Sequence, residues 1–449
     1  MSSGFVTGSG SSDLLPVTFS PSYSSNAPRA YAVINGTPYA IKSFTVDKNS
    51  HGATNTGSLV VSYKGNPDWT VELFRGDQPL TPGGQFSLDT SNNPVYVQIY
   101  AGFPSPASST VPFGGGSLRF YGLVDMYDPY DMDRTEFKLR SLAAPLTTDR
   151  ISTSVQNLTT TAFLQQICAP YGLQVMIDPT LTSPLTLAQV YSQDFVTGLK
   201  NLVKWDVIQR SSMFDDVDVW EDNGTVYYIR PQNVQTAVPS LAQTLNVTYG
   251  KDIKTFHGTH APQFSRNIAV RVHSYTSRVR QSVTTIVADL GFGDVSVTQN
   301  LKTSVSNPVF GTNNGTRTVY SSNGNTSTTS WVSSGGPAQG SNTPLSESGK
   351  EVLDISLPNL TPQACQQYAQ AIWRQVSMHE YQGEFEFAVT PELLQYLNIE
   401  SRITMSGYGM SAFNTTYWPR TMSESFDMSS GWTVKFGCVN HTLFPGQGV

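Results

Sequence analysis

The heptapeptide Gly383-Glu384-Phe385-Glu386-Phe387-Ala388-Val389 alternates polar and apolar residues. Alternation of this kind predicts a strand with one buried face. A helix is predicted just before it, at 362–380, because Thr361 is a good N-cap residue and Pro362 suits the first helical position. Three more strands are predicted after it, at 403–407, 421–428 and 431–436. The end of the chain is therefore predicted to be one helix followed by four strands.

The beginning of the chain divides into an arm and a block of strands. Residues 1–28 are rich in Ser, Gly and Pro and lack periodicity, so we expect an extended arm that becomes ordered against a neighbouring subunit. Asn35-Gly36 lies between two apolar runs and predicts a tight hairpin. Short strands separated by turn residues predict a barrel or sandwich over 29–146. These strands are predicted at 29–34, 39–41, 44–47, 57–63, 70–74, 95–100, 118–124 and 136–142.

The middle of the chain, 147–238, is predicted to be a small α/β unit. Thr159 or Thr160 can cap a helix that carries Phe163, Ile167 and Tyr171 on one face. A strand at 173–177 follows, and Phe195, Leu199, Leu202 and Val203 predict a second helix. The remaining predicted strands are a short one at 207–208 and a hairpin, 218–221 and 225–229, around Asn223-Gly224.

Strands resume at 245–250 and 267–272, so 239–449 is predicted to be a second strand-rich unit. It contains a biased insertion at about 293–350. Between 311 and 349 this insertion is mostly Ser, Thr, Asn and Gly, with Arg317 and Glu347 as its only charges. Such an insertion predicts a protruding loop, within which 319–320 and 331–332 could pair as a short hairpin.

The composition excludes several classes of protein. The 449 residues are 38% hydrophobic and 13% charged, against about 25% charged in a typical protein, and 11% are aromatic. This pattern is typical of a turn-rich β protein rather than a disordered chain. A net charge of -6 argues against a protein that grips nucleic acid by neutralising phosphates. We see no apolar run near 18 residues and therefore expect no membrane span.

Two histidines are candidate metal ligands. His257 and His260 stand three residues apart, but zinc needs a third and a fourth ligand, and no nearby Cys or Glu offers them at a known spacing. We favour solvated or hydrogen-bonded histidines in a turn. The three cysteines also lack metal-ligand spacing, and their odd number argues against a disulfide framework. They are Cys168, Cys365 and Cys438.

Two acidic clusters are candidate functional sites. The first could hold calcium, but it lacks the EF-hand pattern, so a charged hairpin tip is the preferred interpretation. The second could supply a pair of catalytic carboxylates for glycoside hydrolysis, but its position beside a turn predicts solvated, ionised side chains. The first comprises Asp125, Asp128, Asp131 and Asp133, and the second comprises Asp215, Asp216, Asp218, Glu221 and Asp222.

A modest basic run could contact nucleic acid, although a subunit contact or a solvated strand face is preferred. It consists of Arg266, Arg271, Arg278 and Arg280 with Tyr275.

No Gly-x-Ser-x-Gly, HExxH or P-loop motif is present. The sequence therefore predicts a non-enzymatic protein with no catalytic residues, no metal site and no cofactor. The start of the chain lacks a basic and an apolar region, so we expect no secretory signal.

Several segments resemble the baseplate hub proteins of contractile phage tails, also called late control protein D. The segment Phe120-Tyr121-Gly122-Leu123-Val124-Asp125, followed by Phe137-Lys138-Leu139-Arg140-Ser141-Leu142, is similar to the first tube-like domain of that family. The segments 161–167 and 195–202 resemble its connector, and 249–272 and the helix and strands after 361 resemble its second tube-like domain. The resemblance implies a β-rich α+β fold, in which two tube-like antiparallel β-barrels bracket a small α/β connector.

The resemblance also implies a function. Members form a homotrimeric, pseudo-six-fold ring that joins the tail tube, or a distal tube protein, to the central spike and conducts DNA. Baseplate wedge proteins would bind the outside of the ring. The protein would be made in the host cytoplasm and reside in the virion tail baseplate. Because the chain stops at Val449, we expect the spike to be a separate protein.

Other interpretations remain open from the sequence. Within injection particles, the chain could be the tail-tip hub of a non-contractile tail, or a hub of a gene transfer agent or related system. A tail-associated peptidoglycan hydrolase is a different class, and it would need a compact catalytic domain. A glycan-binding receptor protein is a third class, suggested by aromatic, Ser/Thr-rich loops.

Overall fold

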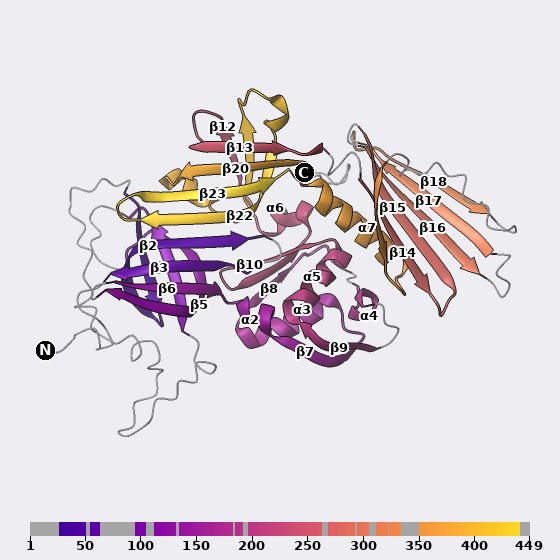
Figure 1. The fold of residues 1–449 in the computed structure, drawn as a ribbon, viewed down its shortest axis with the longest axis horizontal. Helices are drawn as coiled ribbons and strands as arrows, with labels where there is room; N and C mark the ends of the chain where they lie inside the picture. Colours follow the sequence, from indigo (N-terminus) through magenta and orange to yellow (C-terminus); the bar gives the residue numbers. More distant parts are fainter. Residues whose placement is uncertain are drawn as a thin grey trace, which may run out of the picture.

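The computed structural model describes residues 27–50, 54–62, 95–104, 112–131, 134–182, 185–191, 196–262, 268–291, 294–304, 311–321, 323–333 and 350–440. They form a β-rich α+β fold in which two barrel units bracket a small α/β unit in the sequence, as predicted. Figure 1 shows the α/β unit below the barrel units and a further sheet at the opposite end from the N-terminal strands. The predicted arm at 1–28 lies almost wholly outside the described residues, as does the predicted strand at 70–74.

The first barrel is a closed ring of six strands. The strand order is β1-β4-β5-β6-β3-β2, and β2 pairs with β1 again to close the ring. The predicted hairpin is confirmed, because Asn35 and Gly36 take φ values of 46° and 82° between β1 and β2, as a tight two-residue turn requires. The strands are β1 (Arg29–Ile34), β2 (Thr37–Asn49), β3 (Thr56–Ser62), β4 (Tyr96–Gly102), β5 (Gly116–Asp131) and β6 (Arg134–Ser141).

The α/β unit begins after β6, and its first predicted helix is confirmed. The Thr159 side chain caps α3 (Thr160–Cys168) by accepting a hydrogen bond from the Ala162 amide at 3.2 Å. The predicted hairpin is also present as β10 (Asp218–Asp222) and β11 (Thr225–Ile229), and β8 (Gln174–Ile177) pairs in parallel with β11. The other elements are α2 (Ala144–Thr148), β7 (Arg150–Gln156), η2 (Ala169–Tyr171), α4 (Leu187–Val190), η3 (Pro231–Asn233) and α6 (Val234–Ala237).

The second helix predicted in this unit is wrong. The segment carrying Leu199 and Leu202 is a strand, β9 (Val196–Val203), which pairs with β7. The predicted strand at Val207-Ile208 instead lies inside α5 (Lys204–Asp215). Apolar residues at 199, 202 and 203 have the spacing of one face of a helix. In the structure they lie in a strand whose pairing with β7 is irregular, and Asn201 between them takes a positive φ of 53°. The irregularity hides the two-residue period of the strand.

The second barrel unit also contains six strands. Their order is β13-β20-β23-β22-β21-β12; β12 and β21 run parallel, and the other neighbours run antiparallel. All four strands predicted after the helix are present. The elements are β12 (Thr244–Thr248), β13 (Thr255–His260), β20 (Tyr381–Ala388), η5 (Pro391–Tyr396), β21 (Arg402–Ser406), η6 (Ser411–Phe413), β22 (Thr416–Asp427) and β23 (Gly431–Val439).

A third sheet, here called the outer sheet, lies in sequence between β13 and β20. Its order is β18-β17-β16-β15-β14-β19. Much of 293–350 is therefore sheet rather than the predicted protruding loop. A hairpin is present there, formed by β17 and β18, but the predicted pairing of 319–320 with 331–332 is wrong, because Val319 and Tyr320 lie opposite Ser327 and Thr326. Threonine-rich runs favour strands even where hydrophobic residues are scarce. The strands are β14 (Ile268–Thr276), β15 (Gln281–Gly291), β16 (Asp294–Ser304), β17 (Gly311–Tyr320), β18 (Thr326–Ser333) and β19 (Glu351–Ser356).

The predicted helix at 362–380 is present as α7 (Pro362–Ser377), but it does not pack where expected. From the sequence, the apolar helix face formed by Ala369, Ile372 and Val376 is expected to pack on the flank of the C-terminal barrel, the nearest predicted apolar surface. Instead α7 contacts β14, β15 and β16 of the outer sheet and α5 of the α/β unit. Ala369 and Trp373 are buried with Val270, Val272 and other residues of that sheet. The outer sheet supplies the nearer apolar surface, and it could not be anticipated while this region was predicted to be a loop.

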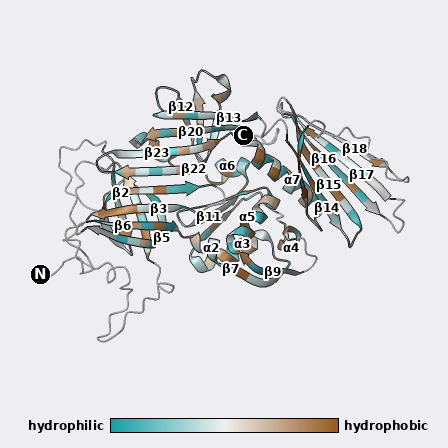
Figure 2. Cartoon of the chain, viewed as in Figure 1, coloured by the Kyte–Doolittle hydropathy of each residue, from teal (hydrophilic) through white to brown (hydrophobic). Residues whose placement is uncertain are grey.

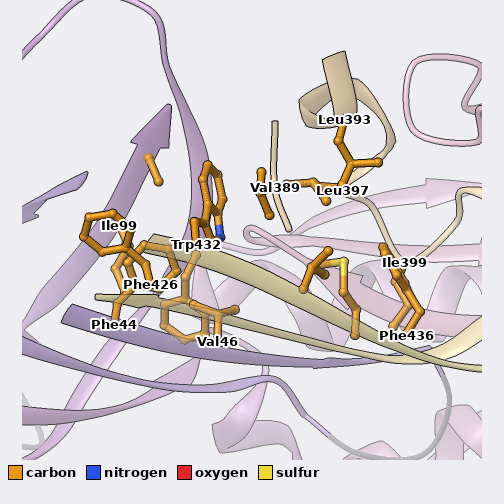
Figure 3. Packing of buried hydrophobic residues seen from close by; sticks show 14 of the residues in the cluster. Phe44, Val46, Ile99, Val389, Leu393, Leu397, Ile399, Phe426, Trp432 and Phe436 are labelled. Carbon is orange, nitrogen blue, oxygen red and sulfur yellow. The ribbon is translucent and has the colours of Figure 1, made fainter. Parts of the chain in front are cut away.

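A single hydrophobic core extends through both barrel units. Phe44 of the first barrel stacks on Phe426 of the second at 5.5 Å between ring centroids, and Trp432 meets Phe44 edge-on at 6.2 Å. Figure 3 shows these rings together with Val46 and Ile99 in one packed group. Figure 2 shows hydrophobic and hydrophilic residues mixed along the strands of both barrel units, as expected where one face of each strand is buried.

Candidate functional site at the junction of the units

The two barrel units share one continuous sheet. Strand β2 of the first barrel pairs antiparallel with β22 of the second, from Ser43 opposite Asp427 to Asn49 opposite Thr421. Together the units form a twelve-stranded sheet. A backbone ladder and a common core hold neighbouring units far more rigidly than a polar contact would. The chain therefore presents the closed first barrel and the six-stranded second barrel unit in one fixed body.

A buried ion pair crosses this body from barrel to barrel. Arg119 on β5 donates to Glu424 on β22, with Nη2 at 2.6 Å from Oε1 and Nε at 3.0 Å from Oε2. The same Nη2 donates to the Leu397 carbonyl oxygen at 2.6 Å. The two side chains are 4% and 0% exposed. A charge pair this deep is tolerated because both charges are paired and hydrogen-bonded, and neither residue can be removed alone without a large cost.

A second group of charges lies where four parts of the chain meet; we call it the inter-unit charge cluster. Three cations reach the carboxylates beside the β10–β11 hairpin, each from a different part of the chain. Lys48 of the first barrel lies 2.5 Å from Asp222, Arg374 of α7 lies 3.0 Å from Asp216, and Arg420 of the second barrel unit lies 3.7 Å from Asp218. Its members are Lys48, Asp216, Asp218, Glu221, Asp222, Arg374, Glu400, Arg402 and Arg420.

The prediction that the acidic residues near Asn223-Gly224 are solvated is wrong for most of them. Asp215, Asp218, Glu221 and Asp222 are all buried. The hairpin looks like an exposed turn in the sequence, but the first barrel, α7 and the second barrel unit cover it. Asp215 accepts hydrogen bonds from Thr160, from the Tyr228 hydroxyl at 2.6 Å and from the Leu185 amide at 3.0 Å, and burial raises its pKa. These contacts give Asp215 a structural role inside the α/β unit.

Two glutamates of the inter-unit charge cluster have strongly altered acidity. Burial, with a smaller contribution from Asp222, raises the pKa of Glu221 to about 7. Burial, with Asp218 as the largest repulsive neighbour, raises the pKa of Glu400 to about 8. Both carboxyl groups therefore hold protons at pH values where an ordinary glutamate is ionised.

The two histidines are in a strand, not in the turn expected from the sequence. His257 and His260 lie three apart on β13, so their side chains point to opposite faces. His260 stacks on Tyr381 at 4.3 Å and lies 3.4 Å from Glu380. Within the described residues, no group of three or more His, Cys, Asp or Glu is placed to hold a metal ion.

The first acidic cluster belongs to the β5–β6 hairpin, the setting that the sequence favoured. Asp125 pairs with Arg140 at 3.2 Å, and both are largely exposed. Asp128 is exposed, Asp131 is the last residue of β5, and Asp133 lies outside the described residues.

The remaining candidate residues from the sequence are the arginines of the basic run and the three cysteines. Arg271 lies 3.3 Å from Asp354, Arg278 and Arg280 occupy the exposed turn between β14 and β15, and Arg266 lies outside the described residues. All three cysteines are buried and unpaired with each other. Burial raises the pKa of Cys168 and of Cys365 to about 12, so neither is an activated thiol.

Comparison with known proteins gives a fold relationship. The sequence matches no protein-family model and no curated protein. A 43 kDa tail protein of prophage MuSo2 from Shewanella oneidensis superposes with a TM-score of 0.54 at 12% identity, over 94% of this chain and 99% of that one. A tail protein from Neisseria meningitidis MC58 superposes with a TM-score of 0.52 at 8% identity, again over 94% of this chain and 99% of that one. The chain has the fold of these two tail proteins.

The structural similarity to the two tail proteins extends over nearly the whole chain. Both tail proteins are matched over almost their full length and over 94% of this chain, so the likeness is not confined to one unit. In the described part of this chain, none of the helices has the length and apolar character needed to cross a bilayer.

Proposed function

We propose that this protein is a structural component of a phage tail, and more specifically the baseplate hub. Three copies would form a ring that joins the tail tube, or a distal tube protein, to a central spike. Baseplate wedge proteins would bind the outside of the ring, and DNA would pass through its lumen. The protein would act in the virion tail after synthesis in the host cytoplasm.

The observation that carries this proposal is the rigid pairing of two six-stranded units within one chain. The β2–β22 ladder and the Arg119–Glu424 pair fix these units side by side. Three chains would then supply six similar units, which is the number needed to match a six-fold tube to a three-fold spike. Heterologous contacts between copies give a closed ring when the rotation between neighbours closes.

The charge balance supports passage of DNA rather than its retention. The chain carries a net charge of -6, and the described arginines of the basic run lie in or beside the outer sheet, away from the barrel units. Affinity for DNA grows with the number of phosphates that Lys and Arg neutralise. A lumen lined by polar and acidic groups would therefore let the duplex slide.

The proposal is tested by the mass of the assembled protein. Native mass spectrometry of the purified chain, alone and with tail extract, should give a species of three copies. A ring of six copies would contradict the hub, because two barrels per chain would then give twelve units. A monomer in assembled tails would favour the tail-tip alternative. Zymography on purified cell walls should be negative, and a cleared band would instead favour a peptidoglycan hydrolase.

A further inference from the structure

The outer sheet ends in two edge strands. Its strand order runs from β18 at one edge to β19 at the other, and neither pairs with a further strand in the part of the chain that the structure describes. The free side of each strand therefore presents backbone N–H and C=O groups that can pair with a strand of another molecule. Proteins usually block such pairing with charged side chains, proline or a bulge at the edge.

Strand β18 has none of these protective features. Its sequence, Thr-Ser-Thr-Thr-Ser-Trp-Val-Ser, contains no charged residue and no proline. Its register with β17 is continuous from Asn313 opposite Ser333 to Tyr320 opposite Thr326. The side chain of Val332 is 72% exposed. Within the described residues, β17 and β18 add only the partly buried Tyr320 to the core of the outer sheet, so this hairpin gains little from packing on its own chain.

The opposite edge, β19, is complementary in charge and in apolar surface. Leu353 on this strand is 42% exposed. The charged residues of β19 are Glu351 and Asp354, both acidic, whereas Arg317 is the only charged residue between 311 and 333. The Nε atom of Arg317 has no hydrogen-bond partner among the described residues. Pairing β19 with itself would bring like charges together, so β18 is the better partner for β19.

The directions and faces of the two edges also match. Strand β19 is parallel to β14, and four successive antiparallel pairings lead from β14 to β18, so β18 and β19 run in the same direction. The same registers place Ser330 and Val332 on the sheet face that carries Leu353 and Ile355. A copy related by rotation about an axis along the strands would therefore offer its β19 in the right direction and with the right face.

The outer sheet also has a suitable position in the chain. The two barrel units lie side by side across the β2–β22 ladder, which is perpendicular to their strands. Figure 1 shows the outer sheet beyond one end of these strands. A ring of barrel units would therefore carry the outer sheets as a second layer at one end of the ring, where neighbouring sheets can meet edge to edge.

We propose that β18 of one copy pairs in parallel with β19 of the next copy, so that three outer sheets join into a closed collar. Full overlap of β19 with residues 328–333 places Ser330 opposite the partner's Leu353 and Val332 opposite the partner's Ile355. This register covers the exposed apolar side chains of both edges. Because β18 and β19 are different surfaces, the contact is heterologous and closes on itself only in a ring. The number of copies in the collar rests on the proposed hub function.

The test is disulfide cross-linking of the full-length double variant Ser330→Cys, Leu353→Cys, with native mass spectrometry of the same preparation. The two positions are exposed, and the three native cysteines are buried, so only the new thiols should react. Oxidation should give a covalent species of three copies on a non-reducing gel. Thr316→Cys, Leu353→Cys is the matched control: Thr316 is exposed opposite Ser330, one strand spacing of about 4.8 Å further from the edge, which is too far for a disulfide.

A second measurement does not depend on the geometry of a disulfide. In the wild type, backbone amides of β18 and β19 should gain protection from hydrogen exchange when the chain assembles. A native mass of three copies with neither a cross-link nor a gain in protection would overturn the collar and leave the hub in place. Dimers formed by Ser330→Cys alone would also overturn it, since they would show that β18 pairs with itself. Cross-linked chains longer than three copies would support the β18–β19 contact and contradict the three-copy ring.

Discussion

Changing Glu424 to glutamine should destabilise the joint between the two barrel units by about 3–5 kcal/mol, the usual cost of removing one partner from a buried ion pair. Arg119 would keep its positive charge at 4% exposure with only neutral acceptors, the new amide oxygen and the Leu397 carbonyl oxygen at 2.6 Å. Because a domain is stable by only about 5–15 kcal/mol, this loss is a large fraction of the total.

The double variant Arg119→Met, Glu424→Leu separates the value of the pair from the cost of breaking it. Replacing both charges by apolar groups of similar size is often close to neutral. Here the Leu397 carbonyl oxygen would lose its donor, which costs about 1–3 kcal/mol. The double variant should therefore be more stable than Glu424→Gln, although less stable than the wild type.

The assay is urea unfolding followed by the fluorescence of tryptophan, because Trp432 lies 5.8 Å from the Arg119 guanidinium group. Asp125→Asn is a matched control on the same strand, β5, since Asp125 belongs to an exposed pair with Arg140 and should cost about 1 kcal/mol or less. The reasoning fails if Glu424→Gln costs no more than this control, or if the double variant is less stable than Glu424→Gln.

Three further outcomes are expected. Gly36→Ala should lower the stability of the first barrel by about 1–2 kcal/mol, because Gly36 has a φ of 82°, and an unchanged melting temperature would refute this. Deleting 311–333 should leave β14, β15, β16 and α7 folded by circular dichroism, since within the described residues β17 and β18 add only the partly buried Tyr320 to the core of the outer sheet, and an unfolded subunit would contradict it. The purified assembly should not retain double-stranded DNA at physiological salt in a gel-shift experiment, and tight retention would refute the proposed acidic or neutral lumen.

The elements that could be predicted are those whose local sequence is sufficient to determine them. The turn at Asn35-Gly36 needs two positive φ values, the cap at Thr159 needs one side chain, and the alternation at 383–389 needs only the strand itself. One strand of the outer sheet, β14, was predicted at 267–272, but the sheet itself was missed because β16, β17 and β18 are rich in Ser, Thr and Asn. Such residues give no hydrophobic period, and the sheet becomes recognisable only when α7 covers one of its faces.

The candidate site could not be found from the sequence for a different reason. Whether Glu221 and Asp222 are solvated depends on Lys48, Arg374 and Arg420, which lie far away along the chain. A turn flanked by carboxylates reads as exposed unless those partners are known. Likewise nothing near Arg119 in the sequence indicates a partner 305 residues away. The predicted domain boundaries at about 28, 146 and 238 stay predictions, and limited proteolysis followed by mass spectrometry would test them.

The most direct test of the central proposal is the symmetry of this protein inside the assembled tail. An averaged electron-microscopy map should place three copies at the junction of tube and spike, with their six barrel units around one channel and with the first barrel and the second barrel unit superposing on each other. A map with six copies in that ring, or with one barrel unit of each chain directed away from the channel, would contradict the account.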